Sequence, residues 1–429
     1  MKQTDTMRER CYQNAAGVPV YHYPNPALHS FCASLYVRAG CMFEGEEENG
    51  ITHLTEHLVF RNVNYGMEGK LYQELDRLGL CLEGCTYKEF VRFTVTGAKE
   101  HFAEGTALLL RLLSPITLPM TEIKTELGRI KAEIREESER TTLDYFSDTI
   151  LHKGTSLSQT ITGTPAVLDR ITKRMICDYQ KKMFSAQNVF FYLTGAISEE
   201  EARSFTVQSD AYAYDPTEPV RENIAPVSSD FFHRGRVFVK NSKRHIVRLS
   251  VDVDMTKTRD AELMLLYDAL FGDGEACRLH RVLSEERGYI YSFRASMELY
   301  RNIGVISVSY EIQPSLLLPS VRLMFDLLKQ AKEDIGDALD YVRAPYTDNA
   351  YLMYDSDADF GWNRAYEGHF LDLPYTTIAE RAAAYASVTP DEVTELARRL
   401  FRAENLTLTV KGDQKTVDTA ALAALLTSM

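Results

Sequence analysis

The residues best suited to chemistry lie in one short stretch, His53-Leu54-Thr55-Glu56-His57. Two histidines four residues apart lie one turn apart on the same face of a helix, so both imidazoles can reach one cation. Glu56 projects near that face and can take a proton from a water molecule that the metal polarises. The stretch therefore predicts a zinc site with a general base, although a surface helix with two unrelated histidines would show the same pattern.

A third ligand must come from elsewhere, because a catalytic zinc site usually has three protein ligands and one open position. The charged run over residues 120–140 contains Glu126 and Glu133, seven residues apart. That spacing is two helical turns, so both carboxylates share one face of a helix. One can bind the metal while the other supports the site. The solvated face of an ordinary helix carries similar acidic residues, so the run alone leaves the choice open.

The first half of the chain has the patterns of a mixed α and β protein. Helical spacing of apolar residues begins at Ile51, and alternation of apolar and polar residues predicts a strand from about Tyr21 to Ala39. Further patterns predict helices over 71–80, 101–114 and 120–140, and strands over 92–98 and 188–197.

The second half repeats this order. It contains a strand pattern at 246–254, a helical pattern at 262–272, two strand patterns near 291–300 and 306–312, and a final strand at 405–412. Aligning residues 51–62 with 261–274 suggests a duplicated unit whose second copy lacks both histidines. A stretch with three prolines, 211–226, is the predicted linker. We expect an α+β fold with two homologous α/β-sandwich domains, 1–210 and 227–429.

Composition narrows the possible partners. A length of 429 residues suits two domains, and 45% hydrophobic with 25% charged residues is typical of a soluble globular protein. A formal charge of -13 disfavours nucleic acids and anionic membranes as partners and favours a neutral or basic peptide. The sequence has neither a long apolar span nor the apolar core of a signal peptide, and seven scattered cysteines are typical of reduced thiols. We therefore expect a cytoplasmic protein.

Several stretches together resemble the inverted-motif (HxxEH) zinc peptidases, that is, the pitrilysin and mitochondrial processing peptidase family M16, in its single-unit bacterial form. Separate matches in the right order are more specific than one short motif. They are RAGCMFEGEEENGITHLTEHLVFRN, GLCLEGCTYKEF, the Glu126 and Glu133 spacing, ITGTPAVLDRIT and NVFFYLTGAIS.

The resemblance implies roles for particular residues. His53, His57 and Glu133 would bind one Zn²⁺ per chain. Glu56 would be the general base, and Glu126 the supporting carboxylate.

The same resemblance places a substrate-binding segment at GLCLEGCTYKEF. The family usually has asparagine and alanine before the threonine that matches Thr86, whereas this chain has Glu83 and Gly84. We predict that these three residues contact the substrate.

The family also uses an arginine and a tyrosine, seven residues apart, to hold the substrate backbone and the oxyanion. The tyrosine matches Tyr291, which we predict to be catalytic, but the arginine position falls on Ser284. A serine cannot supply a charged donor to a developing oxyanion. Arg281 or Arg287 could substitute, although a helix turns each of them to a different face. Alternatively, this chain is the zinc-bearing subunit of a heterodimer, whose second family member supplies the pair, or it forms a homodimer.

The sequence therefore predicts a zinc metalloendopeptidase (a metalloprotease, hence a hydrolase) that acts on short or unfolded peptides, leader peptides included. A different class is a non-catalytic family member that serves as a structural or interaction subunit, yet all motif residues are present here. A purely structural zinc protein is disfavoured by Glu56 beside His57 and by the lack of a fourth strong ligand. The natural substrate is not specified by these residues.

Overall fold

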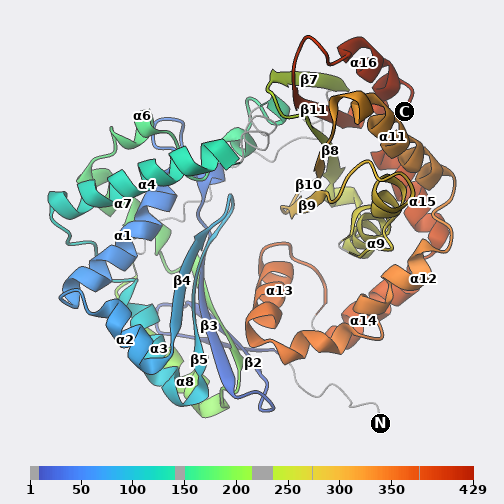
Figure 1. Ribbon diagram of the computed structural model, residues 1–429. Helices are drawn as coiled ribbons and strands as arrows, with labels where there is room; N and C mark the ends of the chain where they lie inside the picture. Colours follow the sequence, from blue (N-terminus) through green and yellow to red (C-terminus); the bar gives the residue numbers. More distant parts are fainter. Residues whose placement is uncertain (1–8, 141–149, 215–234, 273, 376) are drawn as a thin grey trace. The chain divides into compact units, whose positions relative to one another are not determined.

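The computed structural model describes residues 9–140, 150–214, 235–272, 274–375 and 377–429, which group into two compact units (Figure 1). The predicted linker, 211–226, lies mostly outside the described residues, so the predicted ranges 1–210 and 227–429 stay predictions. The segment Tyr351–His369, late in the chain, belongs to the first unit. The first unit comprises the described residues of Met1–Thr142, Gly154–Ala225 and Tyr351–His369, and the second those of Leu143–Lys153, Pro226–Ala350 and Phe370–Met429.

The first unit contains a six-stranded sheet in the order β1-β2-β6-β3-β5-β4. Strands β2 and β6 pair in parallel, and every other neighbouring pair is antiparallel. The strands are β1 (Arg10–Gln13), β2 (Pro19–Pro24), β3 (Ser30–Val37), β4 (Cys81–Thr86), β5 (Val91–Ala98) and β6 (Val189–Gly195).

The prediction of a single strand from Tyr21 to Ala39 is wrong. Two strands, β2 and β3, occupy this stretch, and a turn at Asn25 separates them. The Asn25 side chain accepts a hydrogen bond from the backbone N–H of Ala27, and its carbonyl accepts one from Leu28. A proline followed by an asparagine favours such a turn over a continued strand.

Helices cover both faces of this sheet (Figure 1). Helices α1, α3 and α8 contact strands β4, β5 and β2 on one face, while α13 contacts β3 and β6 on the other. The predicted helices at 51, 71–80, 101–114 and 120–140 are confirmed. The helices are α1 (Ile51–Gly66), α2 (Leu71–Leu78), α3 (Phe102–Arg111), α4 (Met120–Arg140), α6 (Pro165–Leu168), α7 (Lys173–Met183), α8 (Glu199–Ser209) and α13 (Asp357–His369).

The second unit contains a five-stranded sheet in the order β7-β11-β8-β10-β9. Strands β7 and β11 pair in parallel and the other pairs are antiparallel. The strands are β7 (Arg236–Asn241), β8 (Ile246–Asp254), β9 (Arg294–Leu299), β10 (Ile303–Glu311) and β11 (Leu406–Gly412).

This order repeats the topology of strands β2-β6-β3-β5-β4 in the first unit, including the position of the one parallel pair. Helix α1 follows β3, and α9 follows β8 at the equivalent place. The duplicated α+β unit predicted from the sequence is therefore confirmed, and the second copy of the helix, α9 (Asp260–Phe271), contains no histidine.

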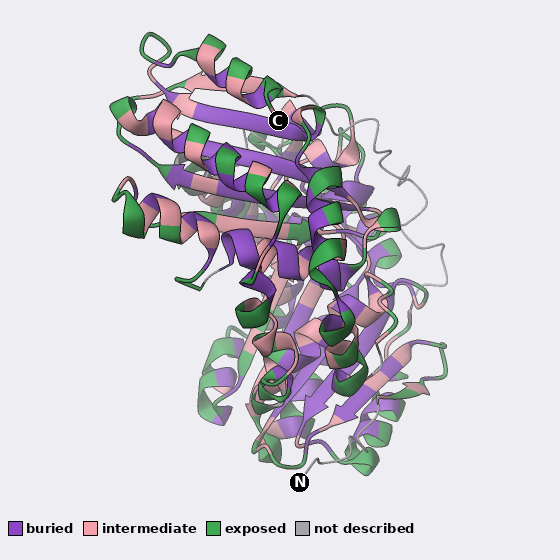
Figure 2. Cartoon of the chain, turned by 90° about the vertical axis from the view of Figure 1, so that its right-hand side faces the viewer, coloured by how far each residue is buried: buried purple, intermediate pink, exposed green. Residues whose placement is uncertain are grey.

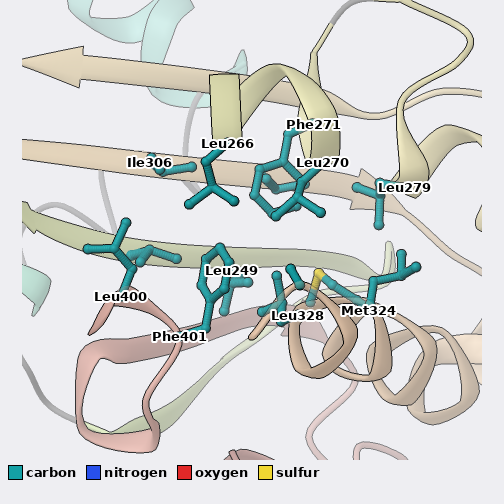
Figure 3. Packing of buried hydrophobic residues seen from close by; sticks show 14 of the residues in the cluster. Leu249, Leu266, Leu270, Phe271, Leu279, Ile306, Met324, Leu328, Leu400 and Phe401 are labelled. Atoms are coloured by element: carbon teal, nitrogen blue, oxygen red, sulfur yellow. The ribbon is translucent and has the colours of Figure 1, made fainter. Parts of the chain in front are cut away.

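The second unit is built around a continuous apolar core between its sheet and its helices (Figure 3). Leu266 and Leu270 of α9 lie near Leu249 and Ile306 of the sheet. The inner strands β8, β10 and β11 are mostly buried, whereas the edge strands β7 and β9 are not (Figure 2). Its other helices are α10 (Arg278–His280), the π-helix η7 (Arg281–Glu286), α11 (Leu317–Glu333), α12 (Ala338–Val342), α14 (Ile378–Ser387), α15 (Pro390–Leu400) and α16 (Thr419–Thr427). Across the described ranges, every helix is too short or too polar to cross a membrane.

Helix α3 approaches the sheet of the first unit closely at Gly105. A β-carbon at this position would lie 2.8 Å from Cζ of Phe31 and 3.2 Å from Cγ2 of Val95. Both neighbours are fully buried, so neither can easily move aside. The exposed Gly128 of α4 is different, because a β-carbon there would meet nothing within 4 Å.

We expect Gly105→Ala to destabilise the protein and Gly128→Ala to stabilise it slightly. Overpacking at Gly105 costs about 1–3 kcal/mol and outweighs the gain of about 0.5–1 kcal/mol from replacing a helical glycine, whereas Gly128→Ala has only the gain. The thermal midpoints of both variants and the wild type measure this. Equal midpoints for the two variants would contradict the close packing of α3 on the sheet.

Candidate metal centre

The two histidines of α1 and one glutamate of α4 come together in the first unit. Nε2 of His53 and Nε2 of His57 each lie 3.6 Å from a carboxylate oxygen of Glu133. One potential donor atom from each of the three residues lies within 4.8 Å of the other two. The structure therefore brings together the three residues predicted as metal ligands, from helices about 70 residues apart in the sequence.

The spacing of these atoms fits a metal ion bound by nitrogen and oxygen. Zinc holds such donors at about 2.0–2.2 Å in a tetrahedron, which places neighbouring donors roughly 3.4 Å apart. Each histidine nitrogen lies 3.6 Å from a different oxygen of Glu133, which is close to that value, and one donor atom of each residue lies within 4.8 Å of the others. Among the residues that the structure describes, this is the sole group of three or more histidines, cysteines or acids arranged to hold a metal ion. Three protein ligands leave a tetrahedral position open.

Glu126 fixes the ring of His57. Its Oε1 lies 2.9 Å from Nδ1 of His57, and because a carboxylate only accepts, Nδ1 must carry the proton. In the neutral ring the lone pair is then on Nε2, the nitrogen that faces Glu133. Oε2 of Glu126 accepts a hydrogen bond of 2.8 Å from Arg61, which also pairs with Glu122. The structure thus places Glu126 beside the predicted ligand His57, where the family resemblance implied a supporting carboxylate, and adds Arg61 behind it.

Burial and neighbouring charges shift the pKa values of the two histidines in opposite directions. Burial, assisted by the nearby His57, lowers the pKa of His53 to about 3. Burial also lowers the pKa of His57, but the hydrogen bond to Glu126 and the charges of three carboxylates outweigh it, so that the net shift is upward. His53 is therefore neutral at ordinary pH, which is the form that binds a metal.

Glu56 is buried beside the histidines. Burial raises the pKa of Glu56 to about 7, the charge of His57 opposes this shift, and the charge of Glu133 adds to it. The hydroxyl of Thr86 favours the charged form. A carboxyl group that titrates near neutral pH can both accept and return a proton, which is what general acid–base catalysis requires.

Strand β4 lies against Glu56. A β-carbon on Gly84 would lie 2.2 Å from Oε1 of Glu56 and 2.6 Å from a ring carbon of Phe60. Successive residues of a strand point to opposite faces, so Gly84 and Thr86 share the face toward α1 while Glu83 points the other way. The side chain of Glu83 accepts a hydrogen bond from Cys81 and is not part of this contact. Substrate binding by these three residues stays a prediction.

A cavity of about 510 Å³ is lined by one of the three predicted ligands, His57. Its lining also includes Glu56 and Phe60, together with the exposed Tyr65 and Tyr72. A cavity of this size can hold several side chains of a peptide.

The residues predicted in the second unit are far less enclosed. Tyr291 is 96% exposed, and Ser284 lies within the π-helix η7. Arg281 of the same helix pairs with Glu286, and Arg287 is exposed. The catalytic role of Tyr291, and substitution by either arginine, stay predictions.

Arg61 is a residue of the site that the sequence analysis missed. The available signal was its position four residues after His57, which places it on the same face of α1, one turn further along. In an isolated helix an arginine at this position is a common surface residue. Only the contact with Glu122 and Glu126 of α4 identifies its role.

Two family models match the chain. The model described as "Insulinase (Peptidase family M16)" matches residues 23–164, and the one described as "Peptidase M16 inactive domain" matches residues 170–340. The first match contains the three predicted metal ligands. The second match begins in the first unit and includes most of the second unit.

Relatives and solved structures agree with this assignment. The chain is 19% identical over 368 residues to an uncharacterized zinc protease of Rickettsia bellii (strain RML369-C), covering 83% of this chain and 87% of that protein. It is 24% identical over 177 residues to the human mitochondrial-processing peptidase subunit beta, covering 41% of this chain and 36% of that protein.

In structure, the chain is similar to the crystal structure of a peptidase M16 inactive domain from Pseudomonas fluorescens, with a TM-score of 0.82 and 17% identity, covering 95% of this chain and 98% of that one. A putative M16-like peptidase from Alicyclobacillus acidocaldarius gives a TM-score of 0.79 at 18% identity and covers 95% and 98% of the two chains. The duplicated fold, the clustered ligands and the two family models lead to one conclusion: this chain belongs to peptidase family M16.

Proposed function

We propose that this protein is a zinc-dependent endopeptidase that hydrolyses short or unfolded peptides, leader peptides among them. The observation that carries the proposal is the convergence of His53, His57 and Glu133 beside the buried carboxyl group of Glu56. Zinc bound by these three side chains would supply a Lewis acid that polarises water and the peptide carbonyl. Relatives named zinc proteases support the choice of metal.

In this proposal Glu56 moves the proton. Its carboxylate takes a proton from the water that attacks the peptide carbonyl, and then gives it to the departing amine. Burial keeps bulk water away from Glu56, and the missing side chain at Gly84 leaves room for its carboxylate. Glu126 holds the His57 ring in the tautomer that presents Nε2 to the metal.

We further propose that full activity requires a second chain of the family. Ser284 stands where the family's arginine is expected, so this chain lacks one charged donor for the oxyanion at that position. A relative is named as a subunit, the mitochondrial-processing peptidase subunit beta. The partner would supply the arginine and tyrosine pair, and a second copy of this chain is the alternative partner.

A non-catalytic role as a structural subunit is the second candidate. One matching family model and one similar crystal structure are both described with the words "inactive domain". However, the model so described matches residues 170–340, whereas His53, Glu56, His57 and Glu133 all precede that range. The catalytic proposal therefore has the stronger support.

Glu126→Gln should weaken zinc binding about 10- to 100-fold, the usual cost of losing a partner that orients a metal ligand. An amide is a weaker acceptor for His57, and it leaves Arg61 with Glu122 as its remaining carboxylate partner. Competition with a chromophoric chelator measures the zinc affinity. Glu136→Gln, an exposed glutamate on the same helix, is the matched control and should bind zinc like the wild type.

Glu56→Gln should keep bound zinc but lower the rate of peptide hydrolysis about 10²- to 10⁴-fold, because the amide cannot accept the proton of water. The assay uses an unstructured peptide library, with the chain alone and with a candidate partner chain. The control is Glu100→Gln, which changes an exposed carboxyl group. Hydrolysis that survives in Glu56→Gln would contradict the role of the base. Full activity of the chain alone would contradict the need for a partner.

Gly84→Ala should reduce hydrolysis about 100-fold while zinc remains bound, because misplacing a catalytic group by about 1 Å costs that much. The new methyl group would overlap Oε1 of Glu56 and displace it. Gly66→Ala at the end of α1 is the control, since a β-carbon there meets nothing within 4 Å. Zinc content and hydrolysis are measured on the same samples. Unchanged hydrolysis in Gly84→Ala would show that Glu56 does not need this space.

A further inference from the structure

Glu44 is a buried carboxylate that holds the beginning of the metal-binding helix. Its Oε2 accepts hydrogen bonds from the backbone N–H of Gly50, at 2.7 Å, and from the side chain of Asn49, at 2.9 Å. Its Oε1 accepts one from the backbone N–H of Thr52, at 2.8 Å. The N-terminal N–H groups of a helix lack partners within the helix, and a carboxylate is a strong acceptor for them. Thr52 directly precedes His53, so this carboxylate anchors the backbone one residue before a metal ligand.

The two histidines depend on this anchor to different degrees. The ring of His57 is oriented through Nδ1 by Glu126. Nδ1 of His53 is buried and makes no hydrogen bond to any residue that the structure describes. The direction in which Nε2 of His53 points is therefore set by the position of its backbone and by packing. A shift in the first turn of α1 would move His53 relative to Glu133 with no second contact to correct it.

A second segment, residues 159–163, contacts the same loop before α1. The side chain of Asn49, besides bonding Glu44, donates to the backbone carbonyl of Thr160 at 2.9 Å. The side chain of Gln159 donates to the carbonyl of Glu44 at 2.9 Å. A β-carbon on Gly163 would lie 2.2 Å from the carbonyl oxygen of Asn49, so the two backbones are in direct contact.

We propose that Glu44 is a positioning residue for the metal site, which acts by fixing the first turn of α1 and thereby the approach of His53 to Glu133. This inference rests on the proposed zinc site but adds a residue outside the ligands and their direct partners. The segment 159–163 completes the anchor, because it holds Asn49 and the backbone of Glu44 in place. In this proposal the acidic loop 44–50 supports metal binding by holding the start of α1 in place.

Glu44→Gln tests the inference in the full-length chain. The amide group must face either the N–H of Thr52 or the donors of Gly50 and Asn49, so that one donor loses its acceptor. We expect zinc affinity to fall about tenfold, the lower end of the cost of losing a supporting contact. Chelator competition well below the unfolding temperature measures this in folded protein. The absorption spectrum of the Co²⁺-substituted chain should also change, because it reports the ligand geometry. Glu44→Asp keeps the charge but is shorter by one methylene, and should lose less affinity.

The matched control is Glu201→Gln on α8. Glu201 also accepts a hydrogen bond from a backbone N–H at a helix start, that of Ser198, but α8 carries no metal ligand. This variant should lower the thermal midpoint and leave both zinc affinity and the Co²⁺ spectrum unchanged. If Glu44 had a purely structural role, Glu44→Gln would likewise lower the thermal midpoint without changing zinc affinity or the Co²⁺ spectrum. Wild-type zinc affinity and a wild-type Co²⁺ spectrum in both Glu44→Gln and Glu44→Asp would therefore overturn the inference.

The readouts are independent of hydrolysis. A wild-type chain that binds zinc but does not cleave peptides would contradict the proposed function and leave this inference standing. A wild-type chain that binds no zinc would overturn both. If Glu44→Gln does not fold, the loss of affinity in Glu44→Asp decides the question, since this variant retains both carboxylate oxygens.

Discussion

The candidate metal site depends on burying ionisable groups on one helix. His53 and Glu56 are both less than 10% exposed, and removing a charged group from water costs several kcal/mol. The structure meets this cost in two ways. His53 is neutral, because burial lowers its pKa to about 3, while the pKa of Glu56 rises to about 7. The remaining charged groups pair between α1 and α4, because His57 and Arg61 contact glutamates of α4. The packing of these two helices therefore also holds the groups of the candidate site together.

The duplicated fold shows that this topology does not require the residues of the candidate metal site. Helix α9 occupies in the second unit the place that α1 occupies in the first, and its residues Leu266, Ala269 and Leu270 are simply buried in the apolar core. The same topology is therefore stable without histidines or a buried glutamate at the metal-site positions. What distinguishes α1 is the position of its buried polar residues: His53 and Glu56 lie within the helix, whereas the buried acids of α9, Asp260 and Glu262, lie in its first turn.

Much of the fold could be predicted from periodicity, because long amphipathic helices such as α4 and fully buried strands such as β6 have strong local patterns. Strand β4 was harder, since it contains Gly84 and alternates only weakly in burial. The grouping of α13 with the first sheet could not be predicted at all. It rests on contacts such as the hydrogen bond from Thr194 to the carbonyl of Asp357, between residues 163 positions apart. No local pattern carries information about such a pair.

The same distinction separates the parts of the site that the sequence revealed from those that it did not. Ligands are recognisable because zinc requires particular atoms at particular spacings, so His53, His57 and the pair on α4 are visible as a pattern. Supporting residues have no fixed type or spacing, because any well-placed hydrogen-bond donor, acceptor or missing side chain can hold a ligand in position. Gly84 contributes only the absence of a side chain, and Glu44 bonds backbone groups that every residue has. Their roles depend on the folded arrangement and not on a sequence pattern. A motif can therefore indicate the reaction from sequence alone, whereas the residues that hold the reacting groups in place are identified only in the structure.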